Sequence, residues 1–398
     1  MKKRYTILLA LALMLFASAL TCLILAINYG FLFGISKNTN KTAGRELASL
    51  LEKIDEVYIG DYDSDEVSAA AMRAVVGALG DRWSFYMTPE EYAEYLDSSN
   101  NQFAGIGVGV IIDEETGGME VMYTYRDSPA EIAGIVAGDV IVGIDERSLA
   151  GMSIEEMREL LARPIGETAD VSVIHVDGSV ETIRVVYDMV FTDPISYEML
   201  DDSIGYIYIE NFEGGAADGF ISAVDQLLAQ GAEALVFDVR SNGGGRVGEM
   251  TRMLDYLLPE GEIFISIDKS GKEEITMSDS AMIDIPAVVI VNGYSFSAAE
   301  YFAATLREYG YADIVGEQTT GKSRSQRTEP LPGGGALHIS TAQYLTKNRV
   351  ALYDVGGITP DYPIALSDEE FAMFVSGNLG LSDDPQLQLA LTALNQKK

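Results

Sequence analysis

The sequence predicts a multidomain α+β protein in which an N-terminal membrane helix precedes a helical cap, a β-rich module and an α/β core with a mixed sheet. Three observations indicate this fold class. A long apolar run opens the chain, short β-branched runs cut by glycine begin near residue 103, and strands alternate with helices after residue 187. With 398 residues, of which 47% are apolar, the chain is long enough for two or three packed domains.

The N-terminal segment is expected to be a membrane anchor. Residues 7–33 are almost entirely apolar, follow Lys2, Lys3 and Arg4, and are long enough to cross a bilayer as one tilted helix. The basic flank predicts an inside N-terminus and an outside remainder. A cleaved signal peptide is the competing interpretation, but the apolar stretch is longer than the apolar region of a usual signal peptide. The one cysteine, Cys22, lies in this run in a poor lipoprotein context, so we expect neither lipidation nor a disulfide.

Amphipathic patterns follow at residues 44–58, 64–79 and 89–97 and predict three helices of a small cap. Thr88 before Pro89 is typical of an N-cap followed by proline at the first helical position.

The β-rich module is expected to contain five strands and two short helices. The helices begin at Ser128, which precedes a proline, and at Ser153, which opens a capping box with Glu156. The predicted strands are residues 108–112, 119–123, 140–144, 169–175 and 181–186.

The last long region alternates strands with helices, which predicts parallel strand pairs joined by crossover helices. Active sites in such sheets gather where strands end and helices begin. The predicted strands are residues 205–209, 234–239, 263–267, 287–291 and 313–315, and the predicted helices are residues 216–228, 247–258 and 298–309. Residues 367–398 are expected to form polar turns and two more helices.

Charge and composition exclude several classes of function. The chain has 61 acidic and 27 basic residues, a formal charge of −34, which repels polyphosphates and offers no basic stripe for nucleic acid. The acidic residues are spread along the chain, as on a solvated surface. With one cysteine and two histidines far apart, no metal site and no cofactor are expected.

Ser297 is the first candidate for chemistry. The apolar strand of residues 286–293 passes through a short turn directly into the helix of residues 298–309, which places Ser297 at a helix N-terminus. Backbone N–H groups and the helix dipole there can stabilise the oxyanion of acyl transfer. A serine at this position is usually only an N-cap, so the chemical interpretation depends on finding a base.

Lys322 is the candidate base, because burial lowers the pKa of a lysine and a neutral amine can activate a serine hydroxyl. His175 belongs to the β-rich module and His338 has no recognisable acid partner, so a Ser-His-Asp triad has weak support. Residues 316–323 match the spacing of a phosphate-binding P-loop. That motif must feed a helix, and Pro330 and the following glycines leave no room for one.

The glycine run of residues 243–245 follows the strand of residues 234–239 and lets backbone N–H groups approach a ligand closely. A plain strand-to-helix turn is the alternative interpretation of this run. Together with Ser297 and Lys322, it becomes a candidate source of a second oxyanion donor.

Taken together, these segments resemble the C-terminal processing peptidases, also called tail-specific proteases, over nearly the whole chain after the anchor. The motifs that carry the resemblance are Asp81-Arg-Trp-Ser-Phe-Tyr-Met-Thr-Pro-Glu-Glu91 for the cap, Phe103-Ala-Gly-Ile-Gly107, Ser128-Pro-Ala-Glu-Ile-Ala-Gly134 and Ala137-Gly-Asp-Val-Ile141 for a PDZ domain, and Phe237-Asp-Val-Arg-Ser-Asn-Gly-Gly-Gly245, Asn292-Gly-Tyr-Ser-Phe-Ser-Ala-Ala-Glu300, Val315-Gly-Glu-Gln-Thr-Thr-Gly-Lys322 and Gly357-Ile-Thr-Pro-Asp361 for the protease core.

The resemblance implies a role for each matching site residue. Ser297 would be the nucleophile, Lys322 the general base and Gln326 the residue that orients the lysine. The oxyanion donors would be the N–H groups of Ala298 and of a glycine in the 243–245 run, in the first place Gly244.

The serine motif departs from the family pattern at Phe296 and Ala299, where the family has small residues of other kinds. These departures affect packing or the substrate pocket rather than the chemistry.

The resemblance also identifies the β-rich module as PDZ-like. In such a domain the loop of Gly105, Ile106, Gly107 and Val108 would bind a terminal carboxylate, and the following strand would add the peptide by β-augmentation.

The expected domains are residues 1–36 for the anchor or signal sequence, 37–102 for the cap, 103–190 for the PDZ-like domain, 191–366 for the serine protease core and 367–398 for a C-terminal helical segment. The expected function is a serine endopeptidase of the cell membrane with a Ser-Lys pair, a single-pass anchor and an extracytoplasmic catalytic part. Its partners would be proteins or peptides with accessible C-termini, with a homodimer as a weaker inference. The alternative is a catalytically inactive PDZ-containing scaffold at the membrane.

Overall fold

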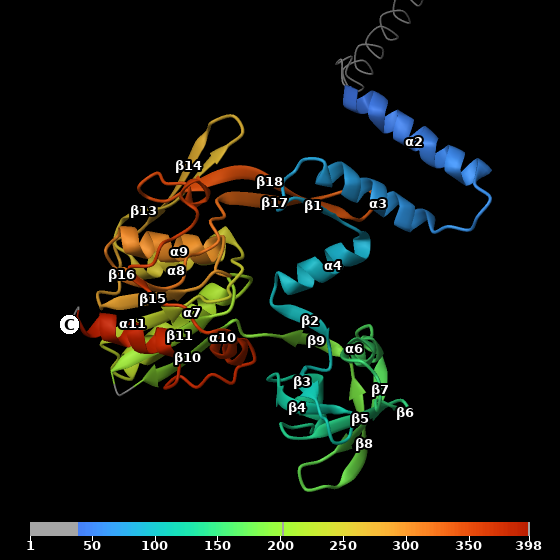
Figure 1. Cartoon of the computed structure of the whole chain (residues 1–398), viewed down its shortest axis with the longest axis horizontal. Helices are drawn as coiled ribbons and strands as arrows, with labels where there is room; N and C mark the ends of the chain where they lie inside the picture. Colours follow the sequence, from blue (N-terminus) through green and yellow to red (C-terminus); the bar gives the residue numbers. More distant parts are fainter. Residues whose placement is uncertain (1–38, 201–202, 397–398) are drawn as a thin grey trace, which may run out of the picture. The chain divides into compact units, whose positions relative to one another are not determined.

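The computed structural model describes residues 39–200 and 203–396, and Figure 1 shows the order of the elements along the chain. Packing divides the chain into two compact units, residues 1–68 and 69–398. The predicted membrane helix, residues 7–33, lies outside the described residues. In the part of the chain that is described, no helix is both long and apolar enough to cross a bilayer.

The three helices predicted for the cap are confirmed. They are α2 (Thr39–Val57), α3 (Ser64–Gly77) and α4 (Pro89–Ser98). α4 begins with the proline at its first position, as predicted. Thr88 accepts a hydrogen bond from the Glu91 N–H at 3.3 Å, and the Glu91 carboxylate accepts one from the Thr88 N–H at 2.8 Å. This reciprocal pair uses donors that a helix start otherwise leaves free.

The β-rich module forms one antiparallel sheet with strand order β3-β4-β5-β7-β8 and β6 beside β5. The five predicted strands and both predicted helices are confirmed. Its elements are β3 (Val108–Ile112), β4 (Met119–Thr124), α5 (Pro129–Ala133), β5 (Val140–Ile144), β6 (Arg147–Ser148), α6 (Ile154–Leu161), β7 (Thr168–Ile174) and β8 (Val180–Val186). Their inward side chains form a separate apolar core. The chain enters and leaves the module through an antiparallel ribbon of β2 (Gln102–Gly105) and β9 (Asp188–Phe191).

The core contains a six-stranded mixed sheet with order β10-β11-β12-β15-β16-β19. Only the β10–β11 pair is antiparallel, so the predicted parallel pairs with crossover helices are confirmed. The strands are β10 (Ile195–Leu200), β11 (Ile204–Ile209), β12 (Ala234–Asp238), β15 (Ala287–Val291), β16 (Ala312–Gly316) and β19 (Tyr362–Pro363), and the helices are α7 (Ala216–Ala229), α8 (Val247–Leu257), α9 (Ala298–Glu308), α10 (Asp368–Val375) and α11 (Pro385–Asn395).

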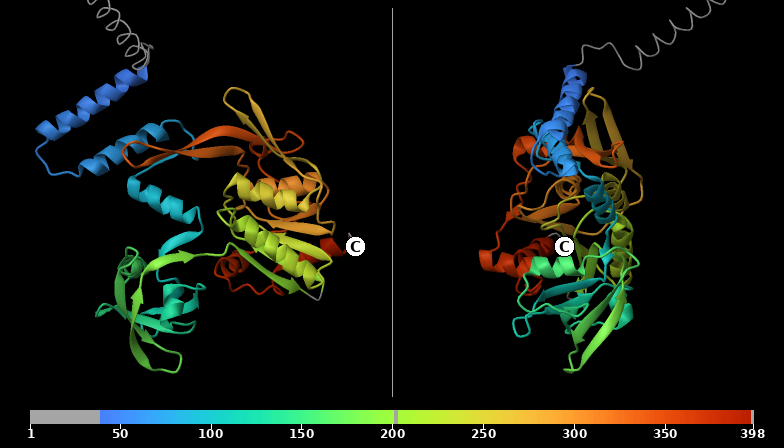
Figure 2. Two further views of the ribbon diagram at one scale, coloured as in Figure 1. Left: turned by 180° about the vertical axis from the view of Figure 1, so that it is seen from behind. Right: turned by 90° about the vertical axis from the view of Figure 1, so that its right-hand side faces the viewer.

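The central strands of this sheet are buried on both faces, because alternate side chains serve two different cores. Leu235 and Phe237 of β12 pack with the core formed by α7, α8 and α9, whereas Ala234 and Val236 pack with α11. Figure 2 shows these three helices on one face of the sheet and α11 on the other. The apolar runs that predicted these strands follow directly from this double burial.

A second sheet differs from the prediction. Residues 263–267 do form a strand, but β13 (Gly261–Asp268) belongs to an antiparallel sheet with order β1-β18-β13-β14 and not to the parallel sheet. Its other strands are β1 (Phe85–Met87), β14 (Glu273–Ser278), β17 (Arg324–Pro330) and β18 (Ala336–Leu345), with β17 paired to β18. A 3-10 helix, η1 (Leu352–Val355), follows. The strand β17 comes directly after Lys322, which confirms that no P-loop helix forms there.

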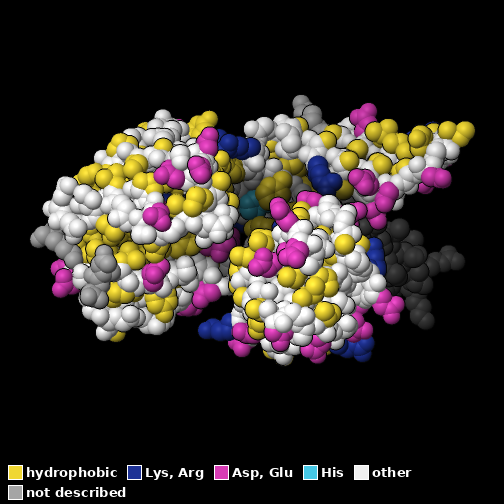
Figure 3. All heavy atoms as spheres, turned by 60° about the horizontal axis from the view of Figure 1, so that its bottom comes forward, with side chains coloured by type: hydrophobic (Ala, Val, Ile, Leu, Met, Phe, Trp, Pro, Cys, Tyr) yellow, Lys and Arg dark blue, Asp and Glu magenta, His cyan; other side chains and the backbone are white. Residues whose placement is uncertain are grey.

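On the face shown in Figure 3, the Asp and Glu side chains are scattered over the surface and do not form one block. Lys and Arg side chains are few on this face. The distribution agrees with a solvated acidic surface.

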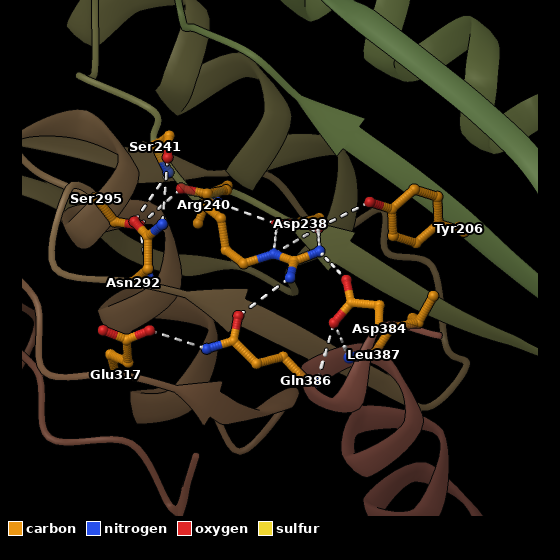
Figure 4. Close-up of polar contacts among 11 residues, drawn as sticks. Tyr206, Asp238, Arg240, Ser241, Asn292, Ser295, Glu317, Asp384, Gln386 and Leu387 are labelled. Carbon is orange, nitrogen blue, oxygen red and sulfur yellow. Dashed lines mark hydrogen bonds and ion pairs between the residues drawn. The ribbon is translucent and has the colours of Figure 1, made fainter. Parts of the chain in front are cut away.

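A buried polar cluster joins the end of β12 to α11, as Figure 4 shows. The Arg240 guanidinium lies between two carboxylates, bound to Asp238 through Nε and Nη2 and to Asp384 Oδ2 at 2.7 Å. It also donates to Gln386 Oε1 at 3.0 Å, and Tyr206 donates to Asp238 at 2.7 Å. Each charged group therefore has a partner, which buried charges require. The cluster fixes the residues that lead into the glycine run.

Candidate active site

Ser297 lies at the turn between the buried strand β15 and the helix α9. Its φ of 61° and ψ of −122° are a conformation that residues with a side chain rarely adopt. The surrounding turn is held by Ser295, whose hydroxyl donates to the Val239 carbonyl at 2.7 Å and accepts from the Asn292 N–H at 3.0 Å. The half-buried Ser297 hydroxyl is thereby presented at the helix N-terminus, as the sequence predicted.

Glu300, one turn into α9, ties this serine turn to the loop that carries Lys322. Its Oε1 accepts from the Thr319 hydroxyl at 2.5 Å and the Gly321 N–H at 2.6 Å. Its Oε2 accepts from the Lys322 N–H at 2.8 Å and the Ser297 N–H at 3.1 Å. Burial raises the pKa of Glu300, and the four donors oppose that shift.

Glu300 was not among the predicted site residues, although the sequence contains a signal for it. Ser297 and Glu300 have the serine-x-x-glutamate spacing of a capping box. What the sequence did not show is that the same carboxylate also receives the backbone of the distant lysine loop.

Lys322 lies in the predicted neighbourhood, in one pocket with Ser297. Burial is the largest cause that lowers the pKa of Lys322, to about 8 from an ordinary 10.5. Asp81 and Glu300 oppose this shift, and Arg82 assists it. With this pKa about a tenth of the lysine is neutral at pH 7, and the neutral amine is the form that a general base needs.

Tyr344 connects the two candidate catalytic residues. Its hydroxyl donates to the Lys322 carbonyl, and burial raises the pKa of Tyr344 far above its ordinary value while a hydrogen bond from Ser297 opposes the shift. The sequence gave no indication of this residue, because β18 reaches the site through long-range strand pairing.

The pocket has a volume of about 490 Å³ and is lined by both polar and apolar side chains. Its polar lining includes the charged pair Glu213 and Arg246 and the side chains of Ser297, Lys322, Ser325, Gln326, Thr328 and His338. Its apolar walls are formed by Leu96 of α4, Val247 and Met250 of α8, Phe264 of β13 and Tyr301 of α9.

The glycine run lies directly against the serine turn. A Cβ atom on Gly244 would fall 2.8 Å from the Ser297 Cβ and 2.9 Å from the Ala298 nitrogen, so only glycine fits at φ 92°. The Gly244 N–H donates to Asn242 Oδ1 at 2.7 Å. This donor of the predicted oxyanion pair is therefore engaged within the protein, whereas the hydrogen bonds of the described residues include none from the Ala298 N–H.

Gln326 lies in the same pocket but not against the lysine amine. Its Nε2 donates to the Arg324 carbonyl at 2.9 Å and to Ser340 Oγ at 3.0 Å. Within the described residues, no hydrogen bond joins its side chain to Lys322. The structure therefore brings five of the predicted residues together, Ser297, Ala298, Lys322 and Gln326 in one pocket and Gly244 against the serine turn, without a hydrogen bond between the lysine and the glutamine.

His338 does reach the pocket, through strand β18. Its Nδ1 lies 2.8 Å from Thr328 Oγ1, and its ring stacks on Phe85 at 4.7 Å between centroids. Burial lowers the pKa of His338. No carboxylate partner to His338 occurs among the hydrogen bonds of the described residues.

The predicted carboxylate loop precedes the edge strand of the PDZ-like sheet. The Ile106 carbonyl accepts from the Ala130 N–H at 2.8 Å, and the Gly107 carbonyl accepts from the Ser128 hydroxyl at 3.2 Å. In the described part of the chain the N–H groups of Ile106 and Gly107 donate to no protein group. β3 follows, with β4 on one side, and no other strand of the described residues pairs with its second edge.

Two family models match the chain. The model for peptidase family S41 matches residues 203–364, and a PDZ domain model matches residues 120–174. The chain is 30% identical to the carboxyl-terminal-processing protease of Picosynechococcus sp. over 334 residues, which cover 82% of this chain and 78% of that protein. The chain belongs to peptidase family S41, among the carboxyl-terminal processing serine proteases.

Two further similarities extend over most of this S41 protease. It is 28% identical to the carboxy-terminal processing protease CtpA of Bacillus subtilis over 354 residues, which cover 88% of this chain and 75% of CtpA. A crystal structure titled as an S41 protease from Bacteroides fragilis superimposes with a TM-score of 0.55 at 15% identity, covering 86% of this chain and 93% of that one. The second likeness concerns the fold alone.

Proposed function

We propose that this S41 protease is an extracytoplasmic, membrane-anchored endopeptidase that cleaves proteins through a Ser297–Lys322 pair. The observation that carries the proposal is that a serine in a strained strand-to-helix turn and a lysine with a lowered pKa line the same pocket. The anchor and the location follow from the apolar run of residues 7–33 and its basic flank.

In the proposed reaction the neutral Lys322 amine takes the proton of the Ser297 hydroxyl as its oxygen attacks the scissile carbonyl. The N–H groups at the start of α9 stabilise the resulting oxyanion. The Lys322 ammonium then gives its proton to the leaving amine, which leaves an acyl-enzyme. A water molecule, activated by the same amine, releases the second product and restores the serine.

The second oxyanion donor requires a local change. The Gly244 N–H is held by Asn242 Oδ1, so this donor becomes available only when the asparagine side chain releases it. The Lys322 amine makes no hydrogen bond to Ser297 among the described residues. Both features fit a resting form that substrate binding completes.

The substrate side chain next to the cleaved bond is proposed to be apolar. The pocket wall beside Ser297 is formed by Val247, Met250, Phe264 and Tyr301, which offer an apolar surface. Burial of an aliphatic side chain against this surface is favourable by about 1.5–3 kcal/mol, whereas a charged one would lose its hydration.

The PDZ domain is proposed to hold the C-terminal end of the substrate. The N–H groups of Ile106 and Gly107 would bind the terminal carboxylate, and the unpaired edge of β3 would add the tail as a further strand. A homodimer is a further part of this proposal.

The test compares Ser297→Ala and Lys322→Met with the wild type on an unfolded substrate with an apolar C-terminal tail. Peptides are identified by mass spectrometry, and Lys269→Met, a change at an exposed lysine in the β13–β14 turn, is the matched control. We expect cleavage by the wild type and the control only. Undiminished cleavage by both active-site variants would reject the Ser-Lys pair.

An inactive PDZ scaffold remains the alternative function, favoured by the engaged Gly244 N–H and the unpaired Lys322 amine. It predicts that the wild type binds the same tail, measured by fluorescence anisotropy, but releases no peptide.

A further inference from the structure

Trp83, the one tryptophan of the chain, lies in the segment between α3 and β1 that the proposed mechanism does not use. Its turn is firmly held. The Asp81 carboxylate accepts from the Trp83 N–H at 3.2 Å and from the Ser84 hydroxyl at 2.7 Å. Ser84 is buried and accepts from the Ser340 N–H of β18 at 3.0 Å. The segment is thereby fixed to the strand that also carries Tyr344.

The Lys322 amine lies on the face of this indole. Its Nζ is 4.3 Å from the Trp83 ring centroid and 6.0 Å from that of Phe296, and the two ring centroids are 5.6 Å apart. An ammonium this close to an indole face is within cation–π range. Among the described residues this amine makes no hydrogen bond and no ion pair. Its immediate surroundings are therefore aromatic.

The ring has two opposing effects on the amine. Its apolar body excludes water and favours the neutral form, while the negative face of the ring favours the ammonium. Four other charged or titratable groups also face the amine. They are Asp81 and Arg82 of the same segment, Glu300 of α9 and His338 of β18. Burial is the largest cause in the net lowering of the Lys322 pKa, which agrees with a ring that excludes water from the amine.

We propose that Trp83 is a positioning residue for the general base, whose indole forms the apolar wall that keeps water from the Lys322 amine. This inference rests on the proposed Ser-Lys function. It assigns a role to a cap residue that lies far from Lys322 in the sequence.

The kinetic test measures kcat/KM against pH for three variants of Trp83 with a short apolar peptide. Trp83→Ala opens the amine to water, so its acid-side inflection should lie about one pH unit above that of the wild type, with kcat/KM about tenfold lower at pH 7. Trp83→Phe retains a ring and should stay near the wild type. Trp83→Leu retains an apolar wall but has no aromatic face to attract the ammonium, so the inflection of its pH profile should lie below that of Trp83→Ala.

Phe85→Leu is the matched control, because this aromatic residue lies two positions along the same segment and stacks on His338 and not on Lys322. Its inflection should remain that of the wild type. A merely structural role of Trp83 would lower kcat/KM equally at every pH. An unchanged inflection in Trp83→Ala, or equal shifts in the alanine and leucine variants, would overturn the inference.

A second readout needs no catalysis. Because Trp83 is the one tryptophan, its fluorescence reports on the amine beside it. In Ser297→Ala protein the emission should change with the same inflection as the kinetic profile, and this change should disappear in the Ser297→Ala, Lys322→Met double variant. Emission that is independent of pH, or equal in both proteins, would contradict the contact. If Lys322→Met instead retains activity, the proposed Ser-Lys function is wrong, but the contact between Trp83 and Lys322 is not contradicted.

Discussion

Replacement of Glu300 by glutamine tests whether one carboxylate holds the Ser297 turn and the Lys322 loop together. Each of its oxygens accepts two hydrogen bonds, and three of the four donors are backbone N–H groups, of Ser297, Gly321 and Lys322. Glutamine has the same shape but replaces one acceptor oxygen by a donor. The fourth donor, the Thr319 hydroxyl, can turn and accept instead.

The expected change in the free energy of unfolding follows from these four hydrogen bonds. With the amide nitrogen at the Oε1 position, the Gly321 N–H loses its acceptor, and a buried unsatisfied donor costs about 1–3 kcal/mol. The remaining bonds to Ser297 and Lys322 lose their charge assistance, which roughly halves their strength. The neutral amide avoids the desolvation penalty of a buried charge, which offsets part of this loss of stability. We expect Glu300→Gln to lower the free energy of unfolding by about 2–3 kcal/mol.

Catalysis should respond more strongly than stability. A displacement of about 1 Å between Ser297 and Lys322 is expected to lower kcat/KM about a hundredfold. Urea unfolding is best measured in a Ser297→Ala background, which removes self-cleavage and leaves the Ser297 N–H in place. Glu308→Gln, on the same helix, is the matched control, because that side chain is only half-buried and accepts one hydrogen bond, from the Asn348 N–H. If both variants lose the same stability and activity, Glu300 has no special role.

Three further predictions concern other parts of the molecule. The kcat/KM of the wild type should rise with pH through an inflection near 8, because only the neutral form of Lys322 accepts a proton; a flat profile from pH 6 to 9.5 would contradict this. Asp384→Asn should lower the free energy of unfolding in urea by about 2 kcal/mol, because Arg240 then keeps only the Asp238 carboxylate. Its control, Asp383→Asn on the neighbouring exposed turn, should change the free energy of unfolding by less than about 0.5 kcal/mol. Gly107→Ala would place a Cβ 2.4 Å from that of Ser128 at φ 78°, so binding of a C-terminal tail peptide should weaken at least tenfold in anisotropy titrations while cleavage of short peptides remains.

The central sheet was predictable because its strands are buried on both faces. β12 and β15 consist almost entirely of buried residues, and a continuous apolar run bounded by glycine is a strong strand signal. β17 is different. Its sequence from Arg324 to Pro330 is polar and mostly exposed or half-buried, and it is a strand because it pairs with β18. Such pairing leaves no local pattern in the sequence.

The same distinction applies to the site. Ser297 could be located because a strand, a turn and a helix are adjacent in the chain, and Lys322 because its motif resembles a family motif. The contact of Lys322 with Trp83 joins segments far apart in the chain, and no periodicity of either segment indicates it. The hydrogen bond from the Gly244 N–H to Asn242 depends on a side-chain orientation, which a residue pattern does not determine.

The position of α11 has a consequence for biosynthesis. The helix α11 covers the second face of the central sheet. Asp384 and Gln386, at the start of this helix, hold Arg240 beside the glycine run. All of these residues are translated well after Ser297 and Lys322. A nascent chain that already contains both proposed catalytic side chains therefore still has an open sheet face, and its Arg240 has only Asp238 of its two carboxylate partners. The second face of the central sheet can be covered only after the ribosome has added residues 384–395, so the core of this protease is completed last.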